Sequence, residues 1–327
     1  MGLDSDTIDK LVHTDVRDVI PKEDLNKFEA SGLFECLNIL NLRDAGKVPG
    51  SRIPEGRVFR SGALPHDDKS VDWISKNADC VVDLRRRDGS EGPKDPIIDG
   101  IKGICEDTLP GDYEKIALEN FTSEEDAAAS WRDHYMDIAR RYSPAFRATL
   151  EYIRDYRGKR LLIHCLLGRD RTSVLLGLLH HLAGSNPEAA RRDYMLSRIG
   201  CEFKRCMVFK SAMVMVGITD PDTPGFDNLI QLRRAYWDAF VEALSEKFGG
   251  WDGYATSRDG LNFSKEDLEK IKDNLTAPPS NRDGDAPSRD GLNLSEDDIK
   301  KAWDDLDSSE EGAKKIWDLN LSCPRKT

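Results

Sequence analysis

The segment from residue 161 to residue 182 constrains the fold more than any other part of the chain. It opens with Leu161-Leu162-Ile163, which predicts a short buried strand, and closes with residues 173–182, whose nearly all-round apolar character predicts a buried helix. Residues 80–84, rich in β-branched side chains, predict another buried strand. Buried strands that alternate with helices indicate an α/β fold with a central, mostly parallel sheet flanked by helices.

Further helices are predicted from periodic apolar positions and from helix-start signals. Ser143-Pro144 is typical of a helix start, with Ser143 as the N-cap and proline at the first helical position. Asn186-Pro187 opens another helix in the same way. The expected helices span residues 67–77, 123–142, 143–156, 186–200 and 226–248, and a further strand is expected at residues 58–60.

The C-terminal part of the chain contains an internal repeat. Residues 257–262 recur unchanged as residues 288–293, an offset of 31 residues, and each copy continues with a serine and, three residues later, an aspartate. Ser264 and Ser295 are suited to cap a helix, and the aspartates Asp267 and Asp298 suit its first turn. We therefore expect a main domain over residues 1–250 and a helical C-terminal segment over residues 251–327.

Charge and composition exclude several classes of function. The 327 residues carry a net charge of −12, which argues against non-specific nucleic-acid binding, because such binding needs a basic surface. No apolar run approaches the ~18 residues of a membrane span, and residues 1–20 lack the apolar core of a signal peptide. The seven cysteines show no disulfide framework and no zinc motif. We expect a cytoplasmic protein with reduced thiols and without metal or cofactor.

The loop between the predicted strand and helix carries residues suited to nucleophilic chemistry. Cys165 and Arg171 are separated by five residues, and Thr172 follows. Backbone N–H groups of such a loop, together with the helix N-terminus, form an anion-binding nest. The fork of Arg171 can hold two phosphate oxygens, and a positive surrounding favours the thiolate of Cys165. The pattern therefore predicts that Cys165 attacks a bound phosphate.

The other loop residues are predicted to shape this nest. Gly168 permits a tight turn, His164 orients the loop by hydrogen bonding, and Thr172 donates its hydroxyl to Cys165. Arg169 would face the substrate beside Arg171 and favour ligands with extra negative charge. The residues predicted to contact substrate are Leu166, Leu167, Gly168, Arg169 and Thr172.

At these residues the sequence resembles the tyrosine and dual-specificity phosphatases whose loop reads His-Cys-x-x-Gly-Lys-Asp-Arg-Thr-Gly. Arg169 replaces the lysine of that pattern, Ser173 replaces its last glycine, and Leu166 and Leu167 are bulkier than many family residues. The resemblance covers about residues 30–275 and includes segments 41–44, 56–64, 82–85, 193–197 and 250–275. It implies a fold like that of the protein tyrosine phosphatases.

The general acid is less well defined than the nucleophile. The family resemblance implies that Asp170, inside the loop, protonates the leaving group. Asp133 and Asp137 lie about 30 residues upstream, the spacing that many cysteine phosphatases use, but on a predicted helix. Asp107 and Asp112 are further candidates on a loop. Four other residues are expected to support the site structurally: Asp83, Arg85, Asp193 and Tyr194.

These patterns predict an enzyme that hydrolyses phosphate monoesters through a phosphocysteine intermediate, with residues 1–250 as its catalytic domain. The substrate can be phosphotyrosine, phosphoserine or phosphothreonine in a protein, or a phosphoinositide. A small-metabolite phosphate or diphosphate is an alternative substrate. Two different functions also fit parts of the pattern: a non-catalytic phosphate-binding module, and a thiol-dependent arsenate reductase using Cys201 and Cys206. The sequence makes no prediction of oligomeric state.

Overall fold

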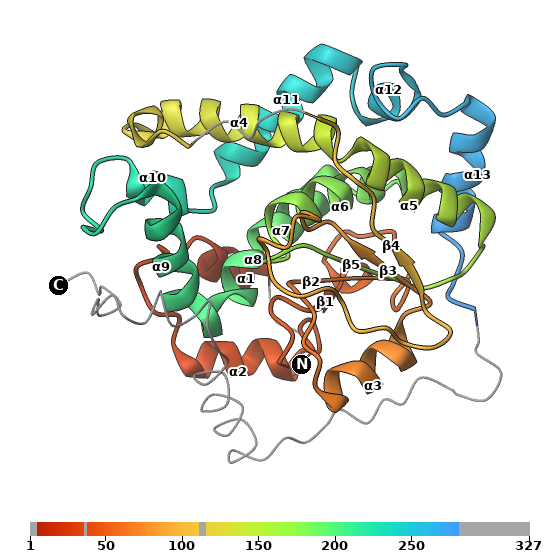
Figure 1. The fold of residues 1–327 in the computed structure, drawn as a ribbon, viewed down its shortest axis with the longest axis horizontal. Helices are drawn as coiled ribbons and strands as arrows, with labels where there is room; N and C mark the ends of the chain where they lie inside the picture. The colour runs from red at the N-terminus through yellow and green to blue at the C-terminus, as the bar shows by residue number, and fades with distance from the viewer. Residues whose placement is uncertain (1–4, 36–37, 111–115, 281–327) are drawn as a thin grey trace.

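A five-stranded sheet lies at the centre of the protein (Figure 1). The computed structural model describes residues 5–35, 38–110 and 116–280. The strand order is β1-β2-β5-β3-β4, with β1 antiparallel to β2 and the other neighbours parallel. The predicted α/β architecture is confirmed. The strands are β1 (Arg43–Asp44), β2 (Val58–Ser61), β3 (Cys80–Asp83), β4 (Lys102–Ile104) and β5 (Leu161–His164).

Side chains along the central strands alternate between two apolar layers, as the two-residue period of a strand requires. Phe59, Val81 and Leu162 belong to a smaller core that also includes Ile74 of α3 (Asp68–Asn77). Their neighbours on the same strands, including Val82 and Ile163, belong to the larger core. Both faces of the sheet are therefore covered, which explains why these strands are apolar without polar alternation.

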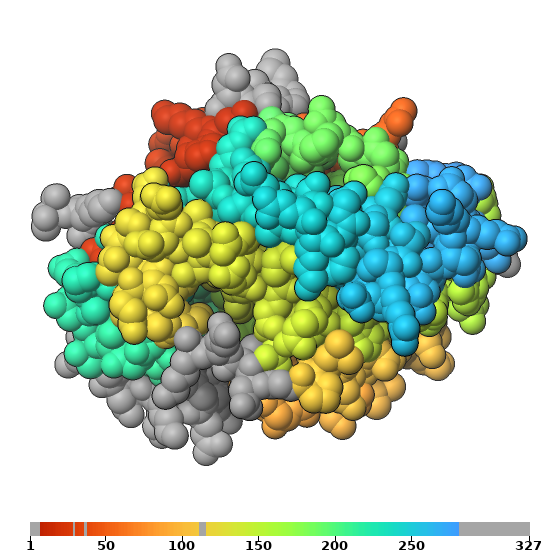
Figure 2. Space-filling model, turned by 90° about the horizontal axis from the view of Figure 1, so that it is seen from above, coloured from red at the N-terminus to blue at the C-terminus, as the bar shows by residue number. Residues whose placement is uncertain are grey.

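The larger core lies under a layer of helices on the opposite face of the sheet from α3 (Figure 1). Seen from above, α4 and α11 lie side by side across this face, and α13 lies towards one end (Figure 2). Buried aromatic side chains such as Tyr135, Trp237 and Phe240 fill the space beneath α4 and α11. The helices of this layer are α4 (Glu124–Arg141), α5 (Ser143–Asp155), α6 (Asp170–Leu182), α7 (Pro187–Met195), α11 (Arg234–Phe248), α12 (Trp251–Thr256) and α13 (Lys265–Leu275).

The N-terminal segment packs at the side of the sheet next to the remaining helices. Arg198 donates to the carbonyl oxygens of Thr14, Asp15 and Asp18, which anchors this segment to the main body. Among the described residues, no helix is both long and apolar enough to cross a membrane. The elements of this region are α1 (Ser5–Val12), α2 (Lys22–Ala30), α8 (Ser197–Gly200), α9 (Arg205–Val216), α10 (Phe226–Ile230) and short 3₁₀ helices at Ala45–Lys47, Leu118–Phe121 and Glu202–Lys204.

The helix predicted over residues 186–200 is broken in two. It forms α7 and α8, with Leu196 between them. In a continuous helix the carbonyl of Asp193 would accept from the amide of residue 197. Here Arg43 donates to that carbonyl at 2.5 Å, so a buried side chain takes the place of a helical bond. The prediction of one helix was wrong because a residue 150 positions away supplies this donor.

The helix predicted over residues 226–248 is also interrupted, at residues 231–233 between α10 and α11. Gln231 adopts an extended conformation with ψ of 156°. Its side chain accepts from the amide of Val16 and donates to Asp15, so the N-terminal segment fixes the break. The aromatic periodicity of the sequence spans this break and could not reveal it.

Two predicted helix starts differ by a few residues from the structure. Ser143 is the first residue of α5 rather than its cap, since Tyr142 occupies the capping position without a side-chain bond. The helix after the loop, α6, begins at Asp170 and not at Ser173. The last two loop residues before Thr172 therefore already belong to the helix N-terminus, where unpaired N–H groups gather.

The C-terminal prediction is confirmed for the first copy of the repeat. Ser264 caps α13 by accepting from the amide of Asp267 at 3.0 Å. The second copy, residues 288–306, lies outside the described residues. The helices α12 and α13 pack against α6 and α5, so this part of the C-terminal segment contacts the main body. The proposed boundary at residue 250 stays a prediction.

The expectation of reduced thiols holds for four cysteines and is wrong for a fifth. Cys80, Cys105, Cys165 and Cys201 are free. Cys206 is disulfide-bonded. Cys201 is free and is therefore not bonded to Cys206 in this structure.

Candidate active site

The loop that contains Cys165 runs from the end of β5 to the start of α6. Its carbonyl oxygens are held from outside by three donors. The amide of Ala63 binds the carbonyl of Leu166 at 3.0 Å. The Asn41 side chain and Nη2 of Arg60 bind the carbonyl of Gly168 at 2.8 and 2.6 Å. In a trans peptide the N–H points opposite to the carbonyl, so the loop amides are directed toward its concave side.

Gly168 allows this loop to lie directly against β2. Its φ of 62° is in the left-handed region, which favours glycine. A Cβ atom at this position would lie 2.1 Å from the carbonyl oxygen of Ser61, a distance that no side chain tolerates. The structure thus requires glycine for both reasons, and it supports the predicted tight turn.

A buried ionic network holds the back of the loop. Asp193 of α7 accepts from Arg43 at 2.9 Å and from Arg60 at 2.7 Å, and all three side chains are almost completely buried. Burial alone would raise the pKa of Asp193, but Arg60, Arg43 and His180 hold that pKa well below its usual value. Asp193 is therefore ionised, and it keeps Arg60 directed at the carbonyl of Gly168.

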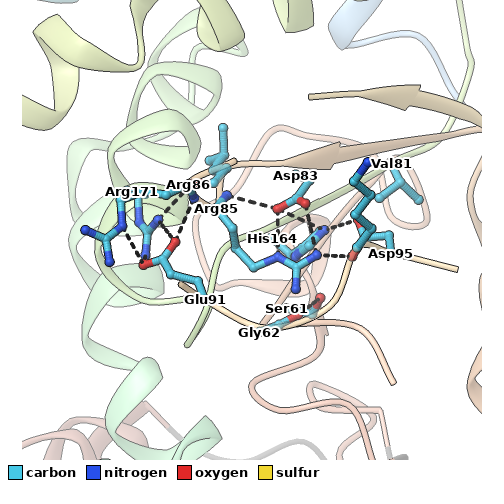
Figure 3. Close-up of polar contacts among 12 residues, drawn as sticks. Ser61, Gly62, Val81, Asp83, Arg85, Arg86, Glu91, Asp95, His164 and Arg171 are labelled. Atoms are coloured by element: carbon cyan, nitrogen blue, oxygen red, sulfur yellow. Dashed lines mark hydrogen bonds and ion pairs between the residues drawn. The ribbon is translucent and has the colours of Figure 1, made fainter. Parts of the chain in front are cut away.

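Arg171 extends from the N-terminus of α6 and forms a bidentate ion pair with Glu91 (Figure 3). Its Nη1 and Nη2 atoms lie 2.6 and 2.7 Å from the two carboxylate oxygens. Nη1 also donates to the carbonyl of Leu84 and to the hydroxyl of Tyr142. In this state a carboxylate occupies the fork that the sequence assigned to a phosphate.

Glu91 belongs to the loop between β3 and β4. One of its carboxylate oxygens also accepts from the amide of Arg86 at 2.7 Å. Burial alone would raise the pKa of Glu91, but its hydrogen bond and charge interaction with Arg171 lower it. Glu91 is therefore an anion in the place where an anionic substrate group is expected.

Asp170 follows the loop and lies among polar side chains of the helical layer. Its carboxylate accepts from the hydroxyl of Tyr135 and from Nε of Arg169, each at 3.1 Å. Tyr135 in turn contacts Tyr194 through the two hydroxyls at 3.0 Å, and the supporting role expected of Tyr194 stays a prediction. Burial alone would raise the pKa of Asp170, but Arg169, His134 and Tyr135 together lower it.

The side chain of Arg169 is turned into the helical layer. Its guanidinium pairs with Asp170, lies 5.5 Å from the ring centroid of Trp131, and donates to the carbonyl of Ile230 at 3.4 Å. Only 12% of the side chain is exposed. The positive charge of Arg169 is therefore compensated within the protein.

His164 lies beneath the loop in a cluster with two aspartates and Arg85 (Figure 3). Its Nε2 atom lies 2.7 Å from Asp95, while Arg85 forms ion pairs with Asp83 and Asp95 at 3.0 and 2.6 Å. His164, Asp83 and Asp95 lie close enough to one another for cation ligation. The guanidinium of Arg85 already contacts both carboxylates and supplies the positive charge there.

The remaining predicted contact residues differ in exposure. Cys165 is 2% exposed and Leu166 is 41% exposed, so the sulfur lies deep while Leu166 projects from the loop. Thr172 is fully buried, and within the described residues its hydroxyl has no hydrogen-bond partner. The predicted bond from Thr172 to Cys165 is therefore not formed in this state.

The alternative acids are held elsewhere. Asp133 pairs with Arg132, and Asp137 pairs with Arg140 and Arg141 on α4. Asp107 pairs with Arg87 at 3.7 Å and is 84% exposed. Asp112 lies outside the described residues.

The sequence patterns did not predict the site contacts of several residues. Glu91 lies outside every strand, helix and motif predicted from the sequence, and no local pattern could pair it with Arg171, 80 positions away. Tyr135 lies in the helix predicted over residues 123–142, and that prediction assigns no role to its hydroxyl. Asn41 and Arg60, which bind the carbonyl of Gly168, lie in segments that resemble the family. This resemblance was the sequence signal that could have identified them.

The comparisons with known proteins agree with this arrangement. The model of the tyrosine phosphatase family matches residues 34–277. The chain belongs to the tyrosine phosphatase family. This match includes every element that contributes to the candidate site, from Asn41 to α7.

Two curated proteins are similar in sequence to this chain. A candidate tyrosine-protein phosphatase of Cupriavidus necator is 25% identical over 240 residues, which cover 70% of this chain and 84% of the relative. A tyrosine-protein phosphatase of Nostoc commune is 27% identical over 133 residues, covering 40% of this chain and 44% of that protein. Membership of this family supports phosphatase activity on a phosphate ester.

Proposed function

We propose that this tyrosine phosphatase family member hydrolyses phosphate monoesters through a phosphocysteine intermediate on Cys165. The observation that carries the proposal is the loop itself. Ala63, Asn41 and Arg60 donate hydrogen bonds to its carbonyl oxygens from outside the loop. Its amides are therefore directed inward, above the buried sulfur. Such an arrangement stabilises a phosphoryl group and the charge that develops on it during transfer.

The reaction begins with attack of the Cys165 thiolate on phosphorus. The S–P bond forms as the P–O bond to the leaving group breaks, and Asp170 gives its proton to the departing oxygen. Water then attacks phosphorus, the S–P bond breaks, and the carboxylate of Asp170 accepts a proton from that water. Inorganic phosphate and the regenerated thiolate complete the cycle.

Asp170 must be protonated for the first step, although its pKa is lowered in the free protein. A bound phosphate dianion supplies negative charge close to the carboxylate, and a nearby like charge raises a carboxyl pKa. Substrate binding therefore favours the protonated form that the reaction needs. This effect explains how the same residue can be ionised before binding and act as an acid afterwards.

Arg171 must exchange its partner during the cycle. In the structure both of its Nη atoms contact Glu91. A phosphate that enters the loop offers oxygens to the same fork, so substrate and Glu91 compete for it. We propose that Glu91 holds Arg171 in position between turnovers and gives way as phosphate binds.

Phosphotyrosine is the substrate that the geometry favours. The side chain of Arg169 is turned toward Trp131 in the helical layer and is only 12% exposed, which weakens the argument for a multiply charged phosphoinositide. The sulfur of Cys165 is deeply placed, and a long aryl ester can reach it while its ring contacts the exposed Leu166. The names of the two relatives also favour a protein phosphotyrosine.

The decisive experiment traps the covalent intermediate. The protein is mixed with an aryl phosphate carrying labelled phosphorus, quenched in acid, and analysed by peptide mass spectrometry. We expect the label on Cys165 in the wild type, and neither label nor turnover in Cys165→Ser. Cys105→Ser is the matched control, because Cys105 is another free thiol and should leave turnover unchanged. Turnover that survives Cys165→Ser would refute the mechanism.

Substrate class is decided by a panel assayed with a chelator present. Phosphotyrosine peptides should show the highest kcat/KM, above phosphoserine and phosphothreonine peptides, phosphoinositides and small-metabolite phosphates or diphosphates. A higher value for a phosphoinositide or a metabolite would reject the substrate assignment but not the mechanism. Binding of phosphate without any turnover would support a non-catalytic module. The cytoplasmic location stays a prediction.

A further inference from the structure

The first copy of the C-terminal repeat packs against α5 and α6, and we call the surface that it covers there the groove. Leu268, Ile271 and Leu275 of α13 are buried there, and Leu261 and Phe263 of the preceding segment are buried beside them. The opposite side of α13 is exposed. The repeat therefore binds through a defined set of apolar positions, and these positions can be compared with those of the second copy.

The second copy retains the apolar character of every one of these buried positions. Leu292 corresponds to Leu261, Leu294 to Phe263, Ile299 to Leu268, Ala302 to Ile271 and Leu306 to Leu275. The capping serine and its aspartate partner are retained as well. Two exposed positions reverse their charge between the copies, since Lys265 and Glu269 correspond to Glu296 and Lys300. The second copy thus preserves the face that enters the groove.

A buried arginine offers an independent reason why the second copy fits. Arg57 is completely buried, and within the described residues its Nε and Nη1 atoms have no hydrogen-bond partner. Burial lowers its pKa to about 10. Its Nη2 atom donates a hydrogen bond of 3.4 Å to the carbonyl oxygen of Asn274 in α13. A carboxylate at position 274 would lie close to this incompletely paired cation.

The second copy has that carboxylate, because Asp305 corresponds to Asn274. The side-chain oxygen of Asn274 already accepts from Arg157 at 3.0 Å, so a carboxylate there has a second arginine within reach. Asp305 would lose the two bonds that the Asn274 amide donates to the carbonyls of Ile153 and Arg154. A carboxylate at this position would therefore exchange these two hydrogen bonds for ion pairs with Arg57 and Arg157.

We propose that residues 288–306 dock in the groove on α5 and α6 of the same molecule whenever the first copy leaves it. The two copies are interchangeable ligands of one surface. The first copy is preferred, because Ile271 fills more space than Ala302 and because its use requires no extra loop. Use of the second copy leaves residues 257–287 as a loop, and closing a loop of this length has a modest entropic cost.

The test uses the full chain and combines substitutions in the two copies. Leu268→Asp with Leu275→Asp disables the first copy, and Ile299→Asp with Leu306→Asp disables the second. We expect the first pair to lower the Tm by only a few degrees and the second pair to leave it unchanged. All four substitutions together should lower the Tm by on the order of 10 °C or prevent folding.

The matched control places aspartates on the exposed side of the second copy. The substitutions Lys300→Asp and Lys301→Asp lie at the positions equivalent to exposed Glu269 and Lys270. When the first copy is disabled, a second copy with these substitutions should still replace it and keep the fall in Tm small, an effect we call the rescue. Hydrogen exchange gives a direct readout, because residues 292–306 should gain protection only when the first copy is disabled. A first-copy variant that loses as much stability as the fourfold variant would overturn the proposal. So would a rescue that depends on protein concentration, since docking within one molecule does not.

Discussion

Nη2 of Arg60 donates to the carbonyl oxygen of Gly168 across 2.6 Å, and this bond joins β2 to the loop that carries Cys165. The same guanidinium reaches Asp193 of α7 through Nη1. One buried arginine therefore fixes the loop relative to two separate elements. The loop is held from behind before any substrate enters it, and such preorganisation is what the proposed phosphoryl transfer requires.

The first prediction concerns the close approach of the loop to β2. Gly168→Ala places a methyl group 2.1 Å from the Ser61 carbonyl and imposes a left-handed φ on alanine, so the loop must move. We expect kcat/KM to fall by at least about a hundredfold, because a small displacement of reacting groups is costly. Gly103→Ala is the control, since a Cβ there has no neighbour within 4 Å. Equal activity of both variants would contradict this view.

The second prediction concerns the buried network. Asp193→Asn leaves Arg43 and Arg60 with an uncompensated positive charge, which in buried pairs costs about 3–5 kcal/mol. The Tm should therefore drop by roughly 10 °C. Asp238→Asn, which breaks an exposed pair with Arg191, should change the Tm by at most about 2 °C. Similar losses for the two variants would mean that the network does not stabilise the fold.

The pH dependence of stability follows from the same residue. The pKa of Asp193 is depressed in the folded protein, so its contribution is complete above its unfolded value, about 3.9. The contribution is lost as the pH falls through the lower folded value. Asp193→Asn should therefore reduce the dependence of the free energy of unfolding on pH below about 4. Denaturant titrations of both proteins at several acidic pH values measure this difference.

The sequence predicted the parts of the fold and site that depend on local pattern. Apolar runs located β3 and β5, and the five-residue spacing from Cys165 to Arg171 defined the loop. The features that the sequence could not predict depend on contacts between residues far apart in the chain. Arg43 interrupts a helix at Asp193, and Glu91 occupies the fork of Arg171, yet neither contact leaves a local sign. The placement of Arg169 depends on Trp131 in the same way.

The third prediction concerns the competition between Glu91 and phosphate. Glu91→Gln removes the negative charge that occupies Arg171, so inorganic phosphate should inhibit this variant at a concentration about tenfold lower. The inhibition constant is measured with an aryl phosphate substrate. Asp99→Asn is the control, because Asp99 is an exposed acid on the same β3–β4 loop. An unchanged or weaker inhibition by phosphate would show that Glu91 positions Arg171 without competing with the ligand.

The last prediction concerns the proton on Asp170. Arg169 is the strongest of the neighbours that lower the pKa of this carboxyl. The proposed reaction needs Asp170 protonated, so we expect activity to fall as the pH rises through that pKa, and a lowered pKa places this alkaline limb at low pH. Arg169→Met removes the charge, raises the pKa, and should move the alkaline limb of kcat/KM upward by about one unit. Arg132→Met, at an exposed arginine paired with Asp133 on α4, should leave the profile unchanged. A profile of Arg169→Met that coincides with that of the wild type would assign the acid to a residue other than Asp170.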